Sequence, residues 1–445
     1  LCAGAGSFLF LLCALTLTYA GARFLEGQSG RARRRVLTLL LLLLFGTLFL
    51  FKYLGFALSM LERLLSAAGL SFTSPALELI LPAGISFYLF MAAGYLIDVY
   101  RGNRPAERSF LLFALFLSFF PYLLSGPIGR ADTLLPQFRE PHRFSYDGFR
   151  SGLLRFLWGA FKKLVIADRL GMLVTTVYAA PDQFGRLQVI AAAAAFSIQI
   201  YCDFSAYSDM ALGCAQVLGF RLMENFRTPY FSRSIGEFWR RWHISLSSWF
   251  RDYLYIPLGG SRRGRMRTYA NLLIVFAVSG LWHGSALAFV AWGLLNGLYQ
   301  VIGGLTADLR TRVRGRLGLT EDGRLTVLLQ VGITFLLSTV AWVFFKGGSF
   351  THALFIFQNM FTGPWLTHPV TAWGLDRPEL VVAFFAILLL LAVDLASLRV
   401  DLWTGFLRLP RPLRWALALS LTLAVLICGI YGTGYDPQDF IYFKF

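Results

Sequence analysis

The chain has 445 residues, of which 57% are hydrophobic and 15% are charged, and its formal net charge is +17. This composition is too apolar for a soluble globular protein and is typical of a chain that crosses a bilayer several times. The positive charge does not indicate nucleic-acid binding, because no basic, aromatic-studded soluble fold accompanies it.

Long apolar runs predict about ten transmembrane helices, with no long soluble insert between them. In chain order the runs lie at residues 3–20, 36–60, 76–98, 109–125, 152–172, 187–204, 270–305, 325–345, 379–398 and 413–432. The run at 270–305 is too long for one crossing, so it predicts two helices. We therefore predict an all-α polytopic membrane protein in which residues 1–445 form a single integral membrane domain. The first residue is Leu1 rather than Met, so we allow for a shortened N-terminus, and we interpret the first run as a span rather than a cleaved signal peptide.

Clusters of arginine predict which loops face the cytoplasm. Basic loops of polytopic proteins face the cytoplasm and its anionic lipids, so the charge indicates membrane lipids as partners. The clusters precede the second, fourth and last runs and consist of Arg31, Arg33, Arg34 and Arg35, of Arg101, Arg104 and Arg108, and of Arg408, Arg411 and Arg414.

Several common chemistries find no support in the sequence. The five cysteines have no CxxC spacing, so neither a disulfide framework nor a metal site is predicted. The motifs GxSxG, HExxH and the P-loop do not occur. A transporter remains an alternative for a glycine-rich polytopic chain, although we find no paired half-length repeats.

An amphipathic segment carries the first of two candidate histidines, His243. At about 100° per residue, the aromatic and apolar residues of 237–253 fall in one arc of about 120°. They are Phe238, Trp239, Trp242, Leu246, Trp249, Phe250 and Tyr253. Because arginines lie opposite this arc, the pattern predicts one helix lying in the membrane interface. His243 lies at the edge of the arc, where it could equally be a structural histidine.

The arginines of this segment are Arg240, Arg241 and Arg251, and two interpretations of them stay open. They could hold the phosphates of membrane lipids, or they could receive an anionic, phosphate-bearing donor at the cytosolic surface.

His283 is the second candidate, and it lies in the uncharged run 270–305. A titratable side chain at membrane depth is costly and therefore indicates a functional site. Gly280 and Gly284 flank it and permit close helix approach or a helix break. His283 could bond across helices as a core residue, or act as a general base that takes a proton from an attacking hydroxyl. A dry tunnel would suit a thioester donor, because it excludes water.

The acidic residues near the apolar runs are expected to be structural. Asp203 and Asp209 are six residues apart, which places them about 120° apart on a helix, so they do not form a tight carboxylate pair. We expect these two, with Asp98, Asp168 and Glu237, to pair mainly with arginines inside the bundle.

Several segments match a known family. They are LPAGISFYLFMAAGYLIDVYRG (81–102), FFPYLLSGPIGR (119–130), GAFKKLVIAD (159–168), the block 201–297, WVFFKGGSF (342–350) and the closing FIYFKF. The most specific run is ENFRTPYFSRSIGEFWRRWHISLSSWFRDYLYIPLGG. In these segments the chain resembles the membrane-bound O-acyltransferase family, and in particular its bacterial alginate, peptidoglycan and teichoic-acid branch. Ser125, Cys202 and Lys346 depart from the usual residues of the motifs.

The resemblance implies a fold and a chemistry. It implies a ring of tilted transmembrane helices, with re-entrant and interfacial helices, around a central tunnel, and a catalytic core at 201–305. It implies that His283 and His243 are the catalytic histidines, and that Trp239, Arg240, Arg241 and Arg251 lie where the donor binds.

The resemblance also implies partners and a location. The donor would be a cytosolic thioester, with acetyl-CoA as the leading candidate and no permanently bound cofactor. The acetyl group would reach an extracytoplasmic polysaccharide through a periplasmic SGNH-type acetyltransferase. The location implied is the bacterial inner membrane. D-alanyl transfer to teichoic acid from a carrier protein is the alternative within this family.

The C-terminal tail, residues 431–445, is predicted to lie on the outer side, because Arg408, Arg411 and Arg414 place the start of the last span in the cytoplasm. The tail ends in FIYFKF and would bury its aromatic surface. It resembles an aromatic C-terminal motif of the bacterial branch whose tyrosine is thought to carry the acyl group. Tyr442 is therefore a predicted transient acyl carrier, with a tail that only packs as the alternative.

Overall fold

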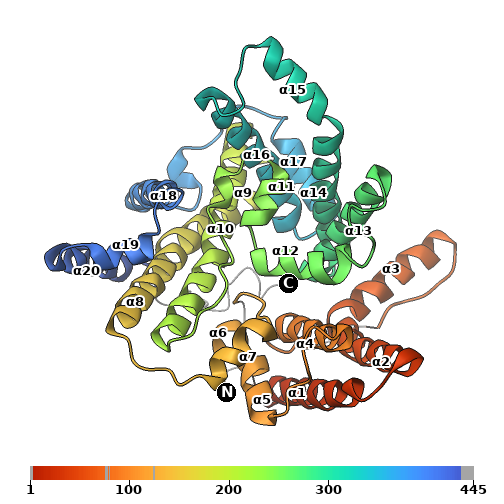
Figure 1. Ribbon diagram of the computed structural model, residues 1–445. Coiled ribbons are helices and arrows are strands. Elements are labelled where there is room, and N and C mark those ends of the chain that lie inside the picture. Colours follow the sequence, from red (N-terminus) through yellow and green to blue (C-terminus); the bar gives the residue numbers. More distant parts are fainter. Residues whose placement is uncertain (1–3, 76–78, 80, 124–125, 432–445) are drawn as a thin grey trace. The chain divides into compact units, whose positions relative to one another are not determined.

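The structure is a computed structural model that describes residues 4–75, 79, 81–123 and 126–431. These residues form helices joined by loops, and no β-strand occurs among them (Figure 1). The all-α prediction is confirmed. The described chain divides into two compact units, residues 1–143 and 144–445. The prediction that residues 1–445 act as one domain stays a prediction.

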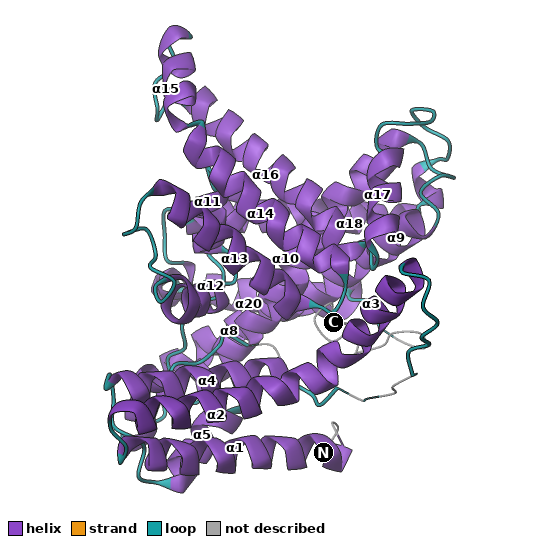
Figure 2. Cartoon of the chain, turned by 90° about the vertical axis from the view of Figure 1, so that its right-hand side faces the viewer, coloured by secondary structure: helices purple, strands orange, loops and turns teal. Residues whose placement is uncertain are grey.

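The first unit is built on three long helices that pack side by side, α1, α2 and α4 (Figures 1 and 2). Its elements are α1 (Gly4–Glu26), α2 (Gly30–Leu48), the π-helical turn η1 (Phe49–Tyr53), α3 (Leu54–Ala67), α4 (Ile85–Arg101), α5 (Phe110–Ser118), α6 (Phe120–Leu123) and α7 (Ala131–Arg139).

Two of the basic loops lie at the same end of this unit. Arg33 donates to the carbonyl of Val99 at 2.8 Å, and Glu26 accepts from the backbone N–H of Ala106 at 3.0 Å. The carboxylate of Glu26 also pairs with Arg23 and Arg108. The loops after α1 and after α4 therefore meet, as the shared cytoplasmic side predicted for both clusters requires.

The second unit carries both candidate histidines. Its elements are α8 (Tyr146–Phe161), the π-helical turn η2 (Lys162–Ala167), α9 (Asp168–Ala179), α10 (Arg186–Val217), the 3₁₀ turn η3 (Pro229–Phe231), α11 (Ile235–Arg241), α12 (Ile244–Phe250), the π-helical turn η4 (Arg251–Tyr255), α13 (Arg265–His283), α14 (Leu287–Leu305), α15 (Ala307–Arg316), α16 (Arg324–Lys346), α17 (Phe350–Asn359), the 3₁₀ turn η5 (Val370–Ala372), α18 (Arg377–Ser397), α19 (Leu402–Arg408) and α20 (Arg411–Cys428). Helix α10 runs along α8, and α13 packs along α14.

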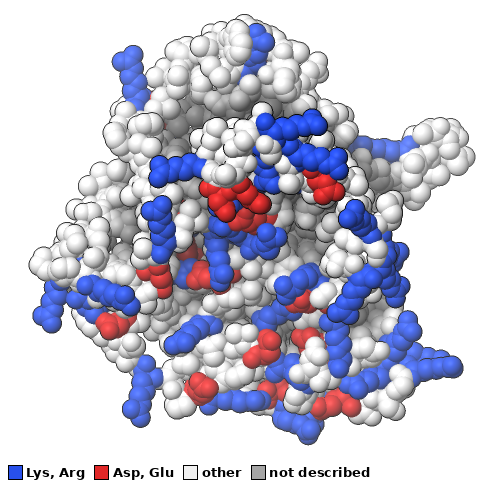
Figure 3. All heavy atoms as spheres, turned by 45° about the horizontal axis from the view of Figure 1, so that its top comes forward, with Lys and Arg blue, Asp and Glu red and all other residues white. Residues whose placement is uncertain are grey.

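Among the described residues, seven helical segments are long and apolar enough to cross a membrane. They are 4–26, 30–67, 186–217, 287–305, 324–346, 377–397 and 411–428. Large apolar side chains on them are exposed, such as Leu336 and Phe385, which is expected of surfaces that contact lipid. Figure 3 shows that acidic side chains gather between basic ones on the face that it draws. The prediction of a polytopic membrane protein is confirmed.

Two of the other predicted spans are interrupted or carry charges, and α4, in the run 76–98, has 17 residues. The run at 109–125 is broken between α5 and α6, where Phe119 leaves the helical conformation ahead of Pro121. The run at 152–172 contains Arg155, Lys162 and Lys163 and divides into α8, η2 and α9. These features explain why fewer helices qualify than the apolar runs predicted.

The predicted division of 270–305 into two helices is confirmed, and glycines bring the two together. A Cβ at Gly280 would lie 2.2 Å from the carbonyl oxygen of Phe289, and one at Gly293 would lie 2.1 Å from that of Phe276. Backbones at this distance leave no room for a side chain. Helix α13 ends at His283, and Gly284 continues in an extended conformation. His283 therefore sits at the end of a closely held helix.

Candidate functional site

His243 lies at a break between two short helices, and this corrects the prediction of one continuous interfacial helix over 237–253. Helix α11 ends at Arg241, His243 takes a left-handed backbone conformation with φ 43° and ψ 54°, and α12 begins at Ile244. The predicted aromatic arc is nevertheless buried, since Trp242 and Leu246 are each 1% exposed. The arc stays buried because the residues on both sides of the break still face the core. The break itself turns the His243 side chain fully inward.

The segment before η3 holds this break in place. The backbone N–H of Arg227 donates to the carbonyl of Arg241 at 2.9 Å, and that of Ile244 donates to the carbonyl of Asn225 at 3.0 Å. A left-handed non-glycine residue is strained and persists only where its surroundings enforce it. These two hydrogen bonds provide that enforcement.

The two candidate histidines are neighbours. Their ring centroids are 6.4 Å apart, and both side chains are buried, with His243 0% and His283 3% exposed. His243 packs edge to face on Phe204 of α10, with a centroid distance of 4.6 Å. His283 packs in the same way on Trp292 of α14 at 4.9 Å and on Phe345 of α16 at 5.4 Å. The predicted pairing of these two residues in one site is consistent with this geometry.

His243 is neutral in this setting. It lies outside the seven candidate spans, and its burial lowers the pKa of its imidazole to about 3. One ring nitrogen, Nδ1, lies 3.2 Å from Oδ1 of Asn225. A neutral imidazole offers one donor and one acceptor nitrogen, so the site can hold or pass a proton without adding a charge.

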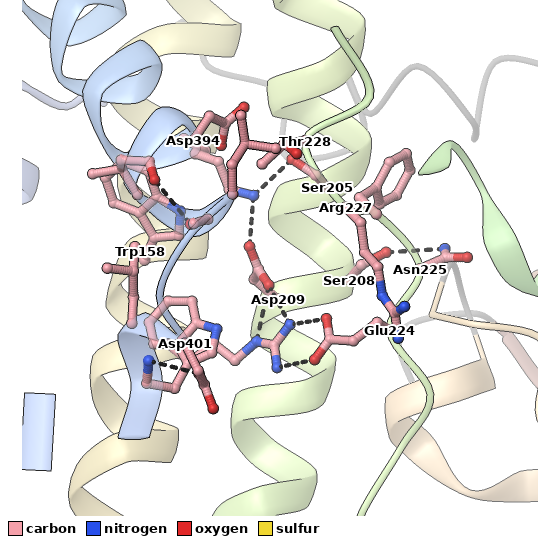
Figure 4. Close-up of a pocket in the computed structure, with 18 of the residues that line it drawn as sticks. Trp158, Ser205, Ser208, Asp209, Glu224, Asn225, Arg227, Thr228, Asp394 and Asp401 are labelled. Atoms are coloured by element: carbon pink, nitrogen blue, oxygen red, sulfur yellow. Dashed lines mark hydrogen bonds and ion pairs between the residues drawn. The ribbon is translucent and has the colours of Figure 1, made fainter. Parts of the chain in front are cut away.

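A polar cavity of about 890 Å³ adjoins the surroundings of His243. It is lined by residues of α8, α10, the 224–228 segment, the end of α11, and the region from the end of α18 to α19. Asn225 lines this cavity and contacts His243, so one side chain joins the two. Figure 4 shows Asn225 bonded to Ser208, with Asp209 and Glu224 nearby.

Ion pairs organise the wall of the cavity. Arg155 donates to both oxygens of Glu224, at 2.7 and 2.5 Å, and to Asp209 at 2.9 Å. Lys162 donates to the other oxygen of Asp209 at 2.6 Å. Deeper between the same helices, Lys163 lies 2.8 Å from both Asp203 and Asp168. The expected pairing with an arginine is confirmed for Asp209, whereas Asp203 and Asp168 pair with Lys163.

The arginines at the rim of the cavity form fewer ion pairs with carboxylates than the cations of its wall. Arg241 pairs with Glu237 at 2.6 Å and donates to Thr228. Arg227 and Arg240 are exposed and line the cavity, and neither has an ion pair with a carboxylate among the described residues. These two guanidinium groups are therefore available to an anionic ligand.

Three other predicted site residues lie elsewhere or outside the described residues. Trp239 is buried in the core, where its indole N–H donates to Asn296 and its ring contacts Trp292. Arg251 is exposed and pairs with Asp252 at 2.8 Å, away from the cavity lining. Tyr442 lies outside the described residues. Roles for all three stay predictions.

Sequence reasoning missed several residues of the cavity. Arg155 and Lys162 could have been found, because charged residues inside the apolar run 152–172 indicate a buried polar site. Asp394 carries the same signal, since it lies inside the apolar run 379–398, whereas Asn225 carries none because it lies in a loop. Asp394 accepts from the hydroxyl of Tyr201 at 3.2 Å. Within the described part of the chain, no three His, Cys, Asp or Glu side chains are grouped to hold a metal ion.

Comparison with known proteins identifies the family. The family model described as MBOAT, membrane-bound O-acyltransferase family, matches residues 102–347. The chain belongs to the membrane-bound O-acyltransferase family. Its members transfer acyl groups, so this polytopic membrane protein is an O-acyltransferase rather than a transporter, and both histidines and the cavity wall from Ser151 to Arg241 lie inside the matched residues.

Individual relatives of this acyltransferase carry related names. A probable alginate O-acetylase of Pseudomonas putida is 39% identical over 343 residues, covering 76% of this chain and 67% of the relative. The protein of the same name in Pseudomonas aeruginosa is 38% identical over 388 residues, covering 85% of this chain and 72% of the relative. A peptidoglycan O-acetyltransferase of Helicobacter pylori is 35% identical over 312 residues, covering 64% and 57%.

We predict that Asp209→Asn destabilises the fold. The change removes the charge that Arg155 and Lys162 share and leaves one buried cation poorly compensated, which typically costs about 3–5 kcal/mol. The measurement is the thermal unfolding temperature of the purified acyltransferase in detergent.

The matched control is Asp147→Asn on α8, where an exposed carboxylate pairs with Arg150. Breaking such a surface pair should cost less than about 1 kcal/mol. Equal unfolding temperatures for the two variants would contradict the structural importance of Asp209.

Proposed function

We propose that this acyltransferase takes an acetyl group from a cytosolic thioester, acetyl-CoA, for O-acetylation of an extracytoplasmic polysaccharide. The observation that carries the proposal is the buried pair of histidines beside a polar cavity with a basic rim. The names of the relatives, which refer to alginate and peptidoglycan, support a polysaccharide acceptor. A periplasmic SGNH-type acetyltransferase would complete the transfer.

The surroundings of the cavity support a cytosolic donor. Its lining includes Asp401, Trp403 and Leu407, which belong to the segment around α19. Arg408, Arg411 and Arg414 follow at once, and the positive-inside rule assigns such a loop to the cytoplasm. A donor would thus enter beside the basic loop, in a bacterial inner membrane.

In this proposal His283 is the general base. It takes the proton of the attacking hydroxyl, the hydroxyl oxygen attacks the thioester carbonyl, and the carbon–sulfur bond breaks to release the donor thiol. His243 lies close enough to help position the donor or to share the proton. The aromatic rings around both histidines exclude water, which would otherwise hydrolyse the thioester.

We predict that His283→Ala abolishes acetyl transfer while the protein still folds and inserts. Loss of a general base typically lowers the rate about 10²–10⁴-fold. The measurement is acetylation of the glycan in cells, with membrane-inserted protein quantified in parallel. His142→Ala changes an exposed histidine of the first unit and should be silent. Acetylation near the wild-type level in the His283 variant would disprove the assignment.

The rim arginines are predicted to bind the donor. Replacing Arg227 and Arg240 together by Gln should weaken donor binding by about tenfold, or about 1.4 kcal/mol, because each can donate charge-assisted hydrogen bonds to a phosphate. Calorimetry with acetyl-CoA measures the effect. Arg233→Gln is the control, since this exposed arginine pairs with Asp322 and does not line the cavity. An unchanged dissociation constant in the double variant would leave these arginines as lipid contacts only.

Tyr442 is proposed as the transient carrier of the acyl group, on the sequence of the tail alone. His283 would deprotonate its phenol, and the resulting ester would then pass to the periplasmic partner. Tyr442→Phe removes only the hydroxyl, so we predict loss of glycan acetylation with normal protein levels. Normal acetylation by this variant would mean that transfer goes directly from the thioester to the partner.

D-alanyl transfer from a carrier protein is the second candidate for the same site. Incubating the purified protein with labelled acetyl-CoA separates the two, because only an acetyltransferase should retain or pass on the acetyl label. The absence of label transfer from acetyl-CoA, together with transfer from a D-alanyl carrier, would favour the alternative.

A further inference from the structure

Asn225 makes an unusual number of hydrogen bonds around His243. Its Oδ1 lies 3.2 Å from Nδ1 of His243, and it accepts from the backbone N–H and the hydroxyl of Ser245 at 3.2 and 2.9 Å. Its Nδ2 donates to the hydroxyl of Ser208 on α10 at 3.1 Å. The side chain is 1% exposed. An amide with this many partners in a buried site is held in a single orientation.

The orientation of this amide follows from one of its partners. A backbone N–H can only donate, so the atom of Asn225 that faces the N–H of Ser245 must be the carbonyl oxygen and not the amide nitrogen. The same oxygen faces His243, and an amide oxygen can only accept. The proton of the neutral imidazole therefore resides on Nδ1, and Nε2 carries the lone pair.

Asn225 also holds the backbone of the break. Its own carbonyl accepts from the N–H of Ile244, while its side chain accepts from the N–H of Ser245. These bonds fasten the residues that follow the left-handed His243. One residue thus fixes both where the imidazole lies and which of its nitrogens is basic.

We infer that Asn225 is the positioning residue of the site: it selects the Nδ1–H tautomer of His243 and so makes Nε2 its basic nitrogen. The effect on catalysis rests on the proposed acetyl transfer, but the tautomer does not. The described groups that contact His243 include Phe204 of α10, Trp282 and His283 of α13, Asn225 and Ser245, and of these His283 is titratable.

The tautomer can be measured without any activity. In protein labelled with ¹⁵N-histidine, protonated and unprotonated ring nitrogens give well-separated signals, and the His243 signals are those lost in His243→Gln. We expect a protonated Nδ1 and an unprotonated Nε2 in the wild type, and the opposite or a mixture in Asn225→Ala. A protonated Nε2 in the wild type would overturn the inference and leave the proposed function intact.

Three variants test the consequence for catalysis. Asn225→Ala removes the acceptor, and the turnover rate should fall about 10- to 100-fold, comparable to the loss of a partner that orients a metal-bound imidazole. The KM for the donor should stay near its wild-type value. Ser248→Ala is the control, since this hydroxyl donates to the carbonyl of Ser245 and does not line the cavity, and it should change the rate less than about threefold.

Asn225→Asp tests the pH dependence of the rate, which a purely structural role of Asn225 would leave unchanged. A carboxylate at this position keeps the acceptor but raises the pKa of the imidazole. His243 must be neutral to act, so the activity falls as the pH drops through that raised pKa and the imidazole becomes protonated. Since burial holds the wild-type pKa near 3 and a neighbouring carboxylate typically raises a pKa by about 1–3 units, the loss should begin below about pH 6, and the ratio of the rates at pH 7 and pH 5 should be about twofold or more larger than in the wild type.

Two results would contradict the inference. One is a pH profile of Asn225→Asp that superimposes on that of the wild type, and the other is a wild-type turnover rate for Asn225→Ala. Thermal unfolding in detergent identifies a variant that fails to fold. If Asn225→Ala fails to fold, the comparison of the pH profile of Asn225→Asp with that of Ser248→Ala decides. Failure of the wild type itself to transfer acetyl would refute the proposed function, while the tautomer measurement would still stand.

Discussion

The buried ion pairs between the end of α8 and α10 are the constraint on which the site depends. Two consecutive lysines of the π-helical turn η2 reach carboxylates on α10, Lys162 to Asp209 and Lys163 to Asp203. Removing either partner strands a charge in a poorly hydrated interior, so the two helices cannot slide past each other. Helix α10 in turn carries Phe204 and Ser208, which support the site around His243.

The two histidines are held by different kinds of interaction. Hydrogen bonds around Asn225 orient His243, whereas close helix packing at Gly280 and edge-to-face aromatic contacts orient His283. The hydrogen bonds around His243 and the apolar packing around His283 together keep both rings buried. Such a site adds no fixed charge next to a reacting carbonyl and leaves little room for water, two conditions under which a thioester survives until the intended hydroxyl attacks.

The sequence predicted the all-α membrane fold and the two helices of 270–305, because each depends on local hydrophobic pattern. It did not predict the break at His243, since a left-handed non-glycine residue is enforced by the distant 225–227 segment. It ended the apolar run of this region near residue 204, whereas α10 continues to Val217 and pairs Asp203 and Asp209 with lysines. The cavity could not be predicted from the sequence, because residues far apart in the chain, such as Arg155 and Trp403, line it together.

The distribution of charge within the cavity bears on how a donor would be distinguished. Arg155 and Lys162 are paired with Asp209 and Glu224, whereas Arg227 and Arg240 at the rim have no carboxylate partner among the described residues. Such a basic rim suits the phosphate of a pantetheine arm. Acetyl-CoA and a carrier-borne thioester share that phosphopantetheine group. Selection between the two donors is therefore expected to depend on the surface outside the rim, where the nucleotide or the carrier would rest.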